Sequence, residues 1–143
     1  MIALQAGQPH YRVLVADDEE SNCRLLSRVL TPVGFHVRRA SNGKEAIKEF
    51  ESWRPHLILM DIRMPVMDGY EAIRRIRAAD GGAEVKIIAV TASVFEEKRD
   101  EVLDTGADDF LSKPFHITEL LEKIRVVLGA EYVYEEKISP VAQ

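Results

Sequence analysis

The stretch LILMDIRMP, residues 57–65, joins four consecutive apolar residues to a single carboxylate, Asp61. A short apolar run bounded by turn-forming residues is typical of a buried strand, and here Pro65 and the Asp68-Gly69 pair supply the turn. Asp61 is therefore expected where a core strand leaves the core. An acid in that position is unfavourable unless another group compensates its charge, so the rest of the chain should provide that group.

Strand patterns of this kind alternate with helical patterns along the chain. The expected strands cover residues 11–16, 35–40, 56–61, 85–90 and 109–112, and the helices between and after them are opened near Ser21, Asn42, Asp68, Phe95 and Ile117. Strict alternation favours an α/β domain with a parallel sheet covered by helices on both faces. We expect this domain over residues 11–128, with a linker or arm over residues 1–10 and a tail over residues 129–143.

Several helix starts carry the residue types that cap a helix. The candidate capping pairs are Asn42 with Glu45, Asp68 with Glu71, and Ser93 with Glu96. The periodicity of the helix after Asp68 turns Ala72, Ile73 and Ile76 inward and Arg74, Arg75 and Arg77 outward.

The composition excludes several classes of protein. A formal net charge of −5 argues against a nucleic-acid partner, which would require a basic surface. The single cysteine, Cys23, rules out an internal disulfide and suits a reducing compartment. No apolar run approaches the roughly 20 residues of a membrane span, and the first residues do not resemble a signal peptide. We therefore expect a cytoplasmic location without direct membrane insertion.

Polar side chains stand at the ends of four of the expected strands. Asp17 and Asp18 follow the first strand, Asp61 ends the third, Thr91 follows the fourth and Lys113 follows the fifth. Because sites in open parallel sheets form at the carboxyl ends of the strands, these groups should share one crevice. Clustered carboxylates raise one another's pKa unless a cation intervenes, and one lysine cannot balance three acids.

Carboxylate oxygens are ligands that suit Mg²⁺, whereas no cluster of histidine and cysteine supports zinc. The histidines are scattered and are interpreted as structural or exposed: His10, His36, His56 and His116. The sequence also lacks a glycine-rich phosphate loop, so a bound nucleotide is not expected.

A carboxylate beside Mg²⁺ can act as a nucleophile toward phosphorus and form an aspartyl phosphate. Phosphoryl transfer spreads negative charge over three oxygens, for which the metal, Lys113 and Thr91 offer a cation, an ammonium and a hydroxyl. Each residue alone has an ordinary interpretation, as a solvated helix start, a capping residue or a surface lysine. Their convergence on one edge favours the functional interpretation.

These residues lie in motifs that resemble the receiver domain of two-component response regulators. The motifs VLVADDEE, LILMDIRMPVMDG, AVTAS and DFLSKPF occur in the order and spacing of that family, and the similarity covers about residues 11–128. The resemblance implies a flavodoxin-like fold, with a five-stranded parallel sheet in the order 2-1-3-4-5 and five helices on its two faces.

The resemblance also implies roles for the acids. Asp61 would be the phosphoacceptor. Asp18 would be the main carboxylate ligand of Mg²⁺, with Asp17 assisting directly or through water. The backbone carbonyl of Arg63 would complete the protein ligands.

Further residues correspond to the switch of the family. Thr91 and Lys113 would be the switch hydroxyl and the phosphate-binding lysine, and the Lys113-Pro114 bond would be cis. Phe110 stands at the rotating aromatic position, where Tyr is common, and lacks the hydroxyl of Tyr. After transfer from a phosphohistidine, Thr91 would move toward the phosphate and Phe110 would pack into the vacated space.

That movement would change the face formed by residues 95–105, 109–112 and 117–128, through which a homodimer is one possible contact. The phosphoryl donor would be a histidine kinase or a histidine phosphotransfer domain. The receiver itself would be a phosphoacceptor with at most self-dephosphorylation activity.

Three biological settings fit this resemblance. The flanks LQAGQPHYRVLVADD and LGAEYVYEE are similar to those of receivers in hybrid sensor histidine kinases, and residues 129–143 are too few for a DNA-binding output domain. A hybrid kinase module, which could be the cytoplasmic part of a membrane-bound kinase, is therefore favoured over a stand-alone regulator that acts by docking. A phosphatase-like enzyme is disfavoured because Arg63 stands where such an enzyme needs an acid/base carboxylate.

Overall fold

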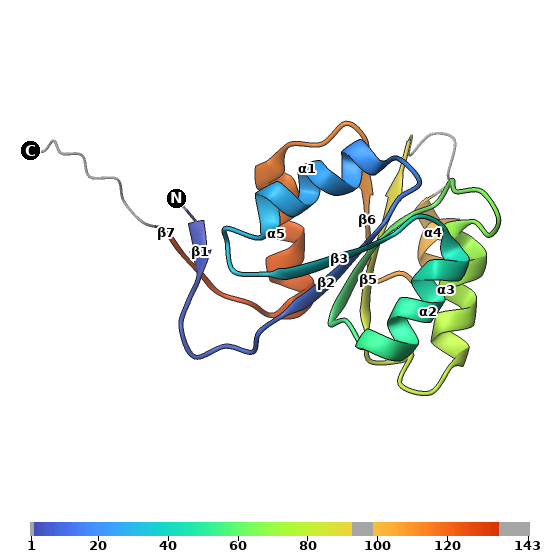
Figure 1. Ribbon diagram of the computed structural model, residues 1–143, viewed down its shortest axis with the longest axis horizontal. Helices are drawn as coiled ribbons and strands as arrows, with labels where there is room; N and C mark the ends of the chain where they lie inside the picture. The colour runs from blue at the N-terminus through green and yellow to red at the C-terminus, as the bar shows by residue number, and fades with distance from the viewer. Residues whose placement is uncertain (1, 93–98, 135–143) are drawn as a thin grey trace, which may run out of the picture.

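A five-stranded parallel sheet forms the centre of the molecule in the computed structural model, which describes residues 2–92 and 99–134 (Figure 1). Its strands lie in the order β3-β2-β4-β5-β6. They are β2 (Arg12–Ala16), β3 (His36–Ala40), β4 (Leu57–Asp61), β5 (Lys86–Thr91) and β6 (Asp109–Ser112). Strand β1 lies outside this sheet, so β2 is the first of its five strands along the chain. Counted in this way, the strands lie in the predicted order 2-1-3-4-5, which is confirmed.

Helices cover both faces of the sheet (Figure 1). On one face lie α1 (Glu20–Leu30) and α5 (Ile117–Leu128), and on the other lie α2 (Gly43–Trp53), α3 (Gly69–Ala78) and α4 (Arg99–Asp104). Every residue of β4 is buried. Leu57 and Leu59 pack in the core under α1 and α5, whereas Ile58 and Met60 pack under α2 and α3. The apolar run that precedes Asp61 therefore joins both cores.

Two of the predicted caps are present. Asn42 Oδ1 accepts a hydrogen bond from the Glu45 N–H at 2.9 Å, and Asp68 Oδ1 accepts one from the Glu71 N–H at 2.9 Å. The predicted cap of Ser93 with Glu96 lies outside the described residues. Within residues 2–92 and 99–134, the structure contains no helix with the length and apolarity that crossing a bilayer requires.

The two ends of the described chain form a small second sheet, which differs from the expected arm and tail. Strand β1 (Ile2–Leu4) pairs antiparallel with β7 (Tyr132–Tyr134). The Leu4 N–H donates to the carbonyl of Val33 at 2.8 Å, and the Tyr132 hydroxyl donates to the carbonyl of Leu121 at 2.8 Å. This ribbon therefore contacts both the loop after α1 and the body of α5.

At the opposite edge of the sheet from the acids, a histidine completes the backbone pairing of β2. The Arg12 N–H donates to Nδ1 of His56 at 2.9 Å, and the ring of Tyr11 packs edge-on against the imidazole. Burial, and secondarily the Arg12 guanidinium, lower the pKa of His56. The unfolded chain therefore binds a proton more readily than the native protein does.

We expect the free energy of unfolding to fall as the pH drops below about 6.5, because the protonated His56 can no longer accept the Arg12 N–H. The stabilising contribution is present above the unfolded-state pKa and is lost as pH falls through the lowered native pKa. Urea unfolding between about pH 5 and pH 8 measures it. His56→Asn keeps an acceptor near Nδ1 but cannot titrate, so its stability should vary less with pH. Equal pH dependence in both proteins would contradict this expectation.

Candidate functional site

Three carboxylates meet at the carboxyl edge of the sheet. Asp61 is the last residue of β4, and Asp17 and Asp18 follow β2, which pairs with β4. One oxygen from each of the three acids lies within 4.8 Å of the others. Asp17 and Asp61 are only 5% and 6% exposed, whereas Asp18 is exposed. The sequence-based expectation that these acids share one crevice agrees with this geometry.

The turn after Asp61 requires a glycine. The Gly69 N–H donates to the carbonyl of Ile62 at 2.8 Å, and this contact brings the start of α3 against the end of β4. A Cβ atom on Gly69 would lie 2.3 Å from the carbonyl oxygen of Asp61. Gly69 therefore allows the backbone to approach closely and fixes the loop beside the acid.

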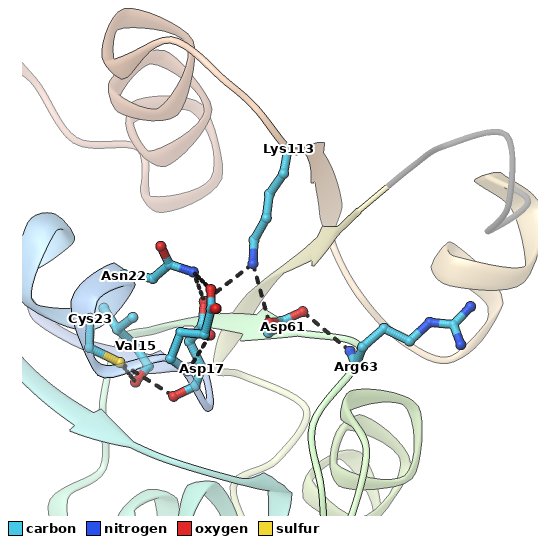
Figure 2. A network of polar contacts seen from close by, with 8 residues as sticks. Val15, Asp17, Asn22, Cys23, Asp61, Arg63 and Lys113 are labelled. Atoms are coloured by element: carbon cyan, nitrogen blue, oxygen red, sulfur yellow. Dashed lines mark hydrogen bonds and ion pairs between the residues drawn. The ribbon is translucent and has the colours of Figure 1, made fainter.

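Lys113 reaches into the cluster from the loop after β6 and lies between two of the acids (Figure 2). Its Nζ is 3.3 Å from Asp17 Oδ2 and 3.3 Å from Asp61 Oδ2. The Lys113 N–H donates to the carbonyl of Thr91 at 2.8 Å, and the Lys113-Pro114 peptide bond is cis, as the resemblance implies.

The charges of this cluster do not balance. Burial raises the pKa of Asp61, the Lys113 ammonium opposes the increase, and the Asp17 carboxylate adds to it. Burial would lower the pKa of Lys113, but Asp61 and Asp17 outweigh this effect and raise it. Lys113 therefore remains an ammonium, and the excess negative charge leaves the cluster suited to an additional cation.

Thr91 supplies a hydroxyl that lacks a partner. It ends β5, the neighbour of β4, and is 1% exposed. Its Oγ1 is the only buried side-chain polar atom without a hydrogen-bond partner among the residues that the structure describes. Leaving a buried hydroxyl unpaired is unfavourable, which is typical of a group whose partner arrives with a ligand.

Arg63 and Phe110 lie at the periphery of the site. The Arg63 N–H donates to Asp61 Oδ1 at 3.2 Å (Figure 2). Phe110 is half-buried in β6, and the Lys123 ammonium lies 5.6 Å from the centre of its ring. Lys123 also forms an ion pair with Asp109 at 3.3 Å, so one α5 side chain contacts two consecutive β6 residues.

Asn22 also belongs to the site, although no sequence motif was interpreted as indicating it. Its Nδ2 donates to Asp17 Oδ2 at 3.1 Å (Figure 2). The same Nδ2 also donates to Glu19 Oε1 at 3.0 Å. The sequence did contain a signal for this contact. Asn22 lies in the first turn of the helix predicted near Ser21, and that turn brings a residue five positions after Asp17 back toward the end of the preceding strand.

A cleft that the sequence did not predict lies beside the acids. Its volume is about 470 Å³, and it lies between α1 and the start of α5. Apolar side chains make up much of its lining, including Leu25, Leu26, Phe115 and Ile117, and Asp61 and Lys113 lie at its polar side. A partner that reaches Asp61 through this cleft would contact apolar surface on the way.

Comparison with known sequences identifies one family. The profile described as the response regulator receiver domain matches residues 13–125. The transcriptional regulatory protein PrrA of Mycobacterium tuberculosis is 37% identical over 125 residues, which are 87% of this chain and 53% of PrrA. The response regulator MprA of Mycolicibacterium vanbaalenii is 38% identical over 82% of this chain and 50% of MprA. The chain thus spans about half the length of these curated relatives.

Solved structures agree with the sequence relatives. The receiver domain of the sensor histidine kinase PA1611 from Pseudomonas aeruginosa, with magnesium coordinated in its active site cleft, has a TM-score of 0.78 at 36% identity. That match covers 85% of this chain and 99% of the PA1611 receiver. The chemotaxis response regulator CheY4 of Vibrio cholerae has a TM-score of 0.79 at 32% identity, over 84% of this chain and all of CheY4.

Proposed function

Because the chain belongs to the family of response regulator receiver domains, we propose that Asp61 accepts a phosphoryl group from a phosphohistidine. An Asp61 oxygen attacks phosphorus, the phosphorus–nitrogen bond breaks, and the departing imidazole nitrogen keeps the electron pair and takes a proton. The observation that carries the proposal is the position of Asp61, a buried acid at a strand end that shares one lysine with a second buried acid.

The neighbouring side chains supply what the transferred group needs. Lys113 lies within 3.3 Å of Asp61 and would pair with one phosphoryl oxygen. The unpartnered Thr91 hydroxyl would donate a hydrogen bond to another. Both groups act on the negative charge of the phosphoryl oxygens, which is where phosphoryl transfer requires stabilisation.

The acid cluster fits a divalent metal. Asp17, Asp18 and Asp61 each offer an oxygen within 4.8 Å of the others, and we propose that they hold Mg²⁺ together with the backbone carbonyl of Arg63. When bound, Mg²⁺ would neutralise charge on the phosphoryl and carboxylate oxygens. The magnesium in the cleft of the PA1611 receiver supports this choice of metal.

Acetyl phosphate with Mg²⁺ tests the proposed function directly. Intact mass spectrometry should show the addition of one phosphoryl group to the wild-type protein, and hydroxylamine should remove it because an acyl phosphate is labile to that nucleophile. A protein that stays unmodified by acetyl phosphate and by a phosphohistidine donor would refute the proposal. A modification resistant to hydroxylamine would place the phosphate on another residue type.

Asp18→Ala is expected to weaken Mg²⁺ binding by about tenfold or more, because it removes an accessible carboxylate from the cluster. Calorimetric titration with Mg²⁺ measures the affinity. Glu20→Ala removes the same charge from an exposed acid that pairs with Arg24 and Arg39, so it controls for the loss of net negative charge. Equal losses of affinity in both variants would mean that Asp18 contributes only through its charge.

We propose that phosphorylation acts on the face formed by α4, β6 and α5. Thr91 would turn toward the phosphate, and the half-buried Phe110 would move inward beside it. Because Lys123 contacts both Phe110 and Asp109, a movement of Phe110 would also disturb α5. The partners of this face would be other signalling proteins, and a second copy of the chain is one candidate.

For the setting of the receiver, we propose a module of a hybrid sensor histidine kinase, located in the cytoplasm. The similarity to the PA1611 receiver supports this setting, and the similarity to PrrA and MprA supports the alternative of a separate response regulator. We place the receiver unit at residues 11–128, to which the β1–β7 ribbon is added. The coding sequence upstream of Met1 distinguishes a hybrid kinase module from a separate response regulator, since a hybrid kinase requires an in-frame kinase core there.

A further inference from the structure

We propose that Asn22 is a positioning residue that holds the Asp17 carboxylate in the orientation that receives the metal. The inference deepens the proposed function and rests on it, because it concerns the same acid cluster. No side chain other than those of Asn22 and Lys113 donates a hydrogen bond to Asp17 within the described part of the chain.

Both oxygens of Asp17 accept hydrogen bonds (Figure 2). Oδ1 accepts the Glu19 N–H at 2.9 Å, and Oδ2 accepts Asn22 Nδ2 at 3.1 Å and Lys113 Nζ at 3.3 Å. Because Asp17 is 5% exposed, water can replace these donors only in part. Oδ1 is therefore held by the backbone at the start of α1, and Oδ2 is held by two side chains.

Lys113 and Asn22 differ in what they do when a phosphoryl group arrives. Lys113 is shared with Asp61 at the same 3.3 Å distance, so pairing with a phosphoryl oxygen would draw it away from Asp17. Asn22 stands on α1 and has no hydrogen bond to Asp61. It would remain the side-chain donor to Asp17 throughout the reaction.

The amide group suits this role. Its Nδ2 carries two N–H groups, so the bond to Asp17 is made with one of them while the other bonds Glu19. The group is neutral, so it orients the carboxylate without cancelling the charge that attracts a metal. Lysine at the same place would compete with the metal for that charge.

Asn22→Leu tests the inference, because leucine has nearly the same size but no donor. We expect its Mg²⁺ affinity, measured by calorimetry, to be about tenfold weaker than that of the wild type, as for other residues that orient a metal ligand. Glu19→Ala removes the second acceptor of Asn22 and leaves its bond to Asp17, so this variant should keep the wild-type affinity. Urea unfolding of each variant checks that the fold is intact.

Phosphorylation kinetics separate positioning from a general structural effect. In Asn22→Leu, the Mg²⁺ concentration that gives half the maximal rate with acetyl phosphate should rise about tenfold, while the rate at saturating Mg²⁺ stays at the wild-type value. An unchanged affinity, an equal loss in Glu19→Ala, or a lower saturated rate would each overturn the role of Asn22. If the wild-type protein itself gains no acyl phosphate, the proposed function fails, and the calorimetric comparison alone then judges Asn22.

Discussion

Asp61→Asn is expected to abolish phosphoryl uptake from acetyl phosphate while the protein remains folded. The amide oxygen of asparagine is a far weaker nucleophile than a carboxylate, so no acyl phosphate should form. Asparagine has the same shape and can still accept the Arg63 N–H that now binds Asp61 Oδ1. Intact mass after incubation with acetyl phosphate and Mg²⁺ measures the loss.

A matched control lies in the same loop. Asp68 caps α3 by accepting the Glu71 N–H, and asparagine caps a helix as well as aspartate does. Asp68→Asn makes the same chemical change at an exposed acid and should gain one phosphoryl group, as the wild type does. Uptake at the wild-type rate in Asp61→Asn would show that another residue is the acceptor.

Asp61→Asn should also stabilise the fold at neutral pH. Burial and the nearby Asp17 raise the pKa of Asp61 even though Lys113 opposes them, so the native environment disfavours the charged carboxylate. The stability linked to this group is present below its unfolded-state pKa of about 3.9 and is lost as the pH rises through the raised native pKa. Asparagine does not ionise, so the urea midpoint of Asp61→Asn should exceed that of the wild type at neutral pH.

The strands and the acid cluster could be predicted because their signals are local. Each predicted strand agrees with the observed one to within one residue at either end. In a parallel sheet the carboxyl ends of all strands lie at the same edge. The positions of Asp61 and Asp17 at the ends of apolar runs therefore predicted that the two acids share this edge, and their oxygens do lie close together.

The β1–β7 ribbon could not be predicted in the same way. It pairs two three-residue segments from opposite ends of the described chain, Ile2 with Tyr134 and Leu4 with Tyr132. Segments this short do not establish a periodicity, and the partner of each is not encoded nearby. The family motifs do not help either, because both strands lie outside residues 13–125.

For Arg77, the prediction from helical periodicity was wrong. The helical periodicity after Asp68 predicted that Arg74, Arg75 and Arg77 all point outward. Arg74 and Arg75 are indeed exposed and pair with Glu71, but the Arg77 side chain is only 19% exposed. Periodicity does not distinguish a solvated guanidinium from one that folds back onto buried carbonyl groups.

The Arg77 guanidinium joins three segments of the chain. It donates to the carbonyls of Gly82 and Val85 before β5, to the carbonyl of Gly106 after α4 at 2.8 Å, and to Asp108 Oδ2 at 2.9 Å. Asp108 Oδ2 also accepts the Ile87 N–H at 2.8 Å. Arg77 therefore anchors the end of α4 and the start of β5 to α3.

Arg77→Met is expected to lower the free energy of unfolding by about 2–4 kcal/mol, because it leaves Asp108 and several carbonyls without their charged donor. Methionine keeps the apolar part of the side chain, so the loss reports the guanidinium. Arg74→Met, on the exposed face of the same helix, should change stability by no more than about 0.5 kcal/mol. Urea unfolding of both variants against the wild type measures the difference.

The location of Arg77 also predicts what the variant should keep. The guanidinium contacts lie at the start of β5, whereas Thr91 and the acid cluster lie at the carboxyl edge of the sheet. Folded Arg77→Met should therefore still gain a phosphoryl group on Asp61, although less urea unfolds it. A loss of stability equal to that of Arg74→Met would mean that water replaces the guanidinium at these carbonyls, and Arg77 would then not anchor α4.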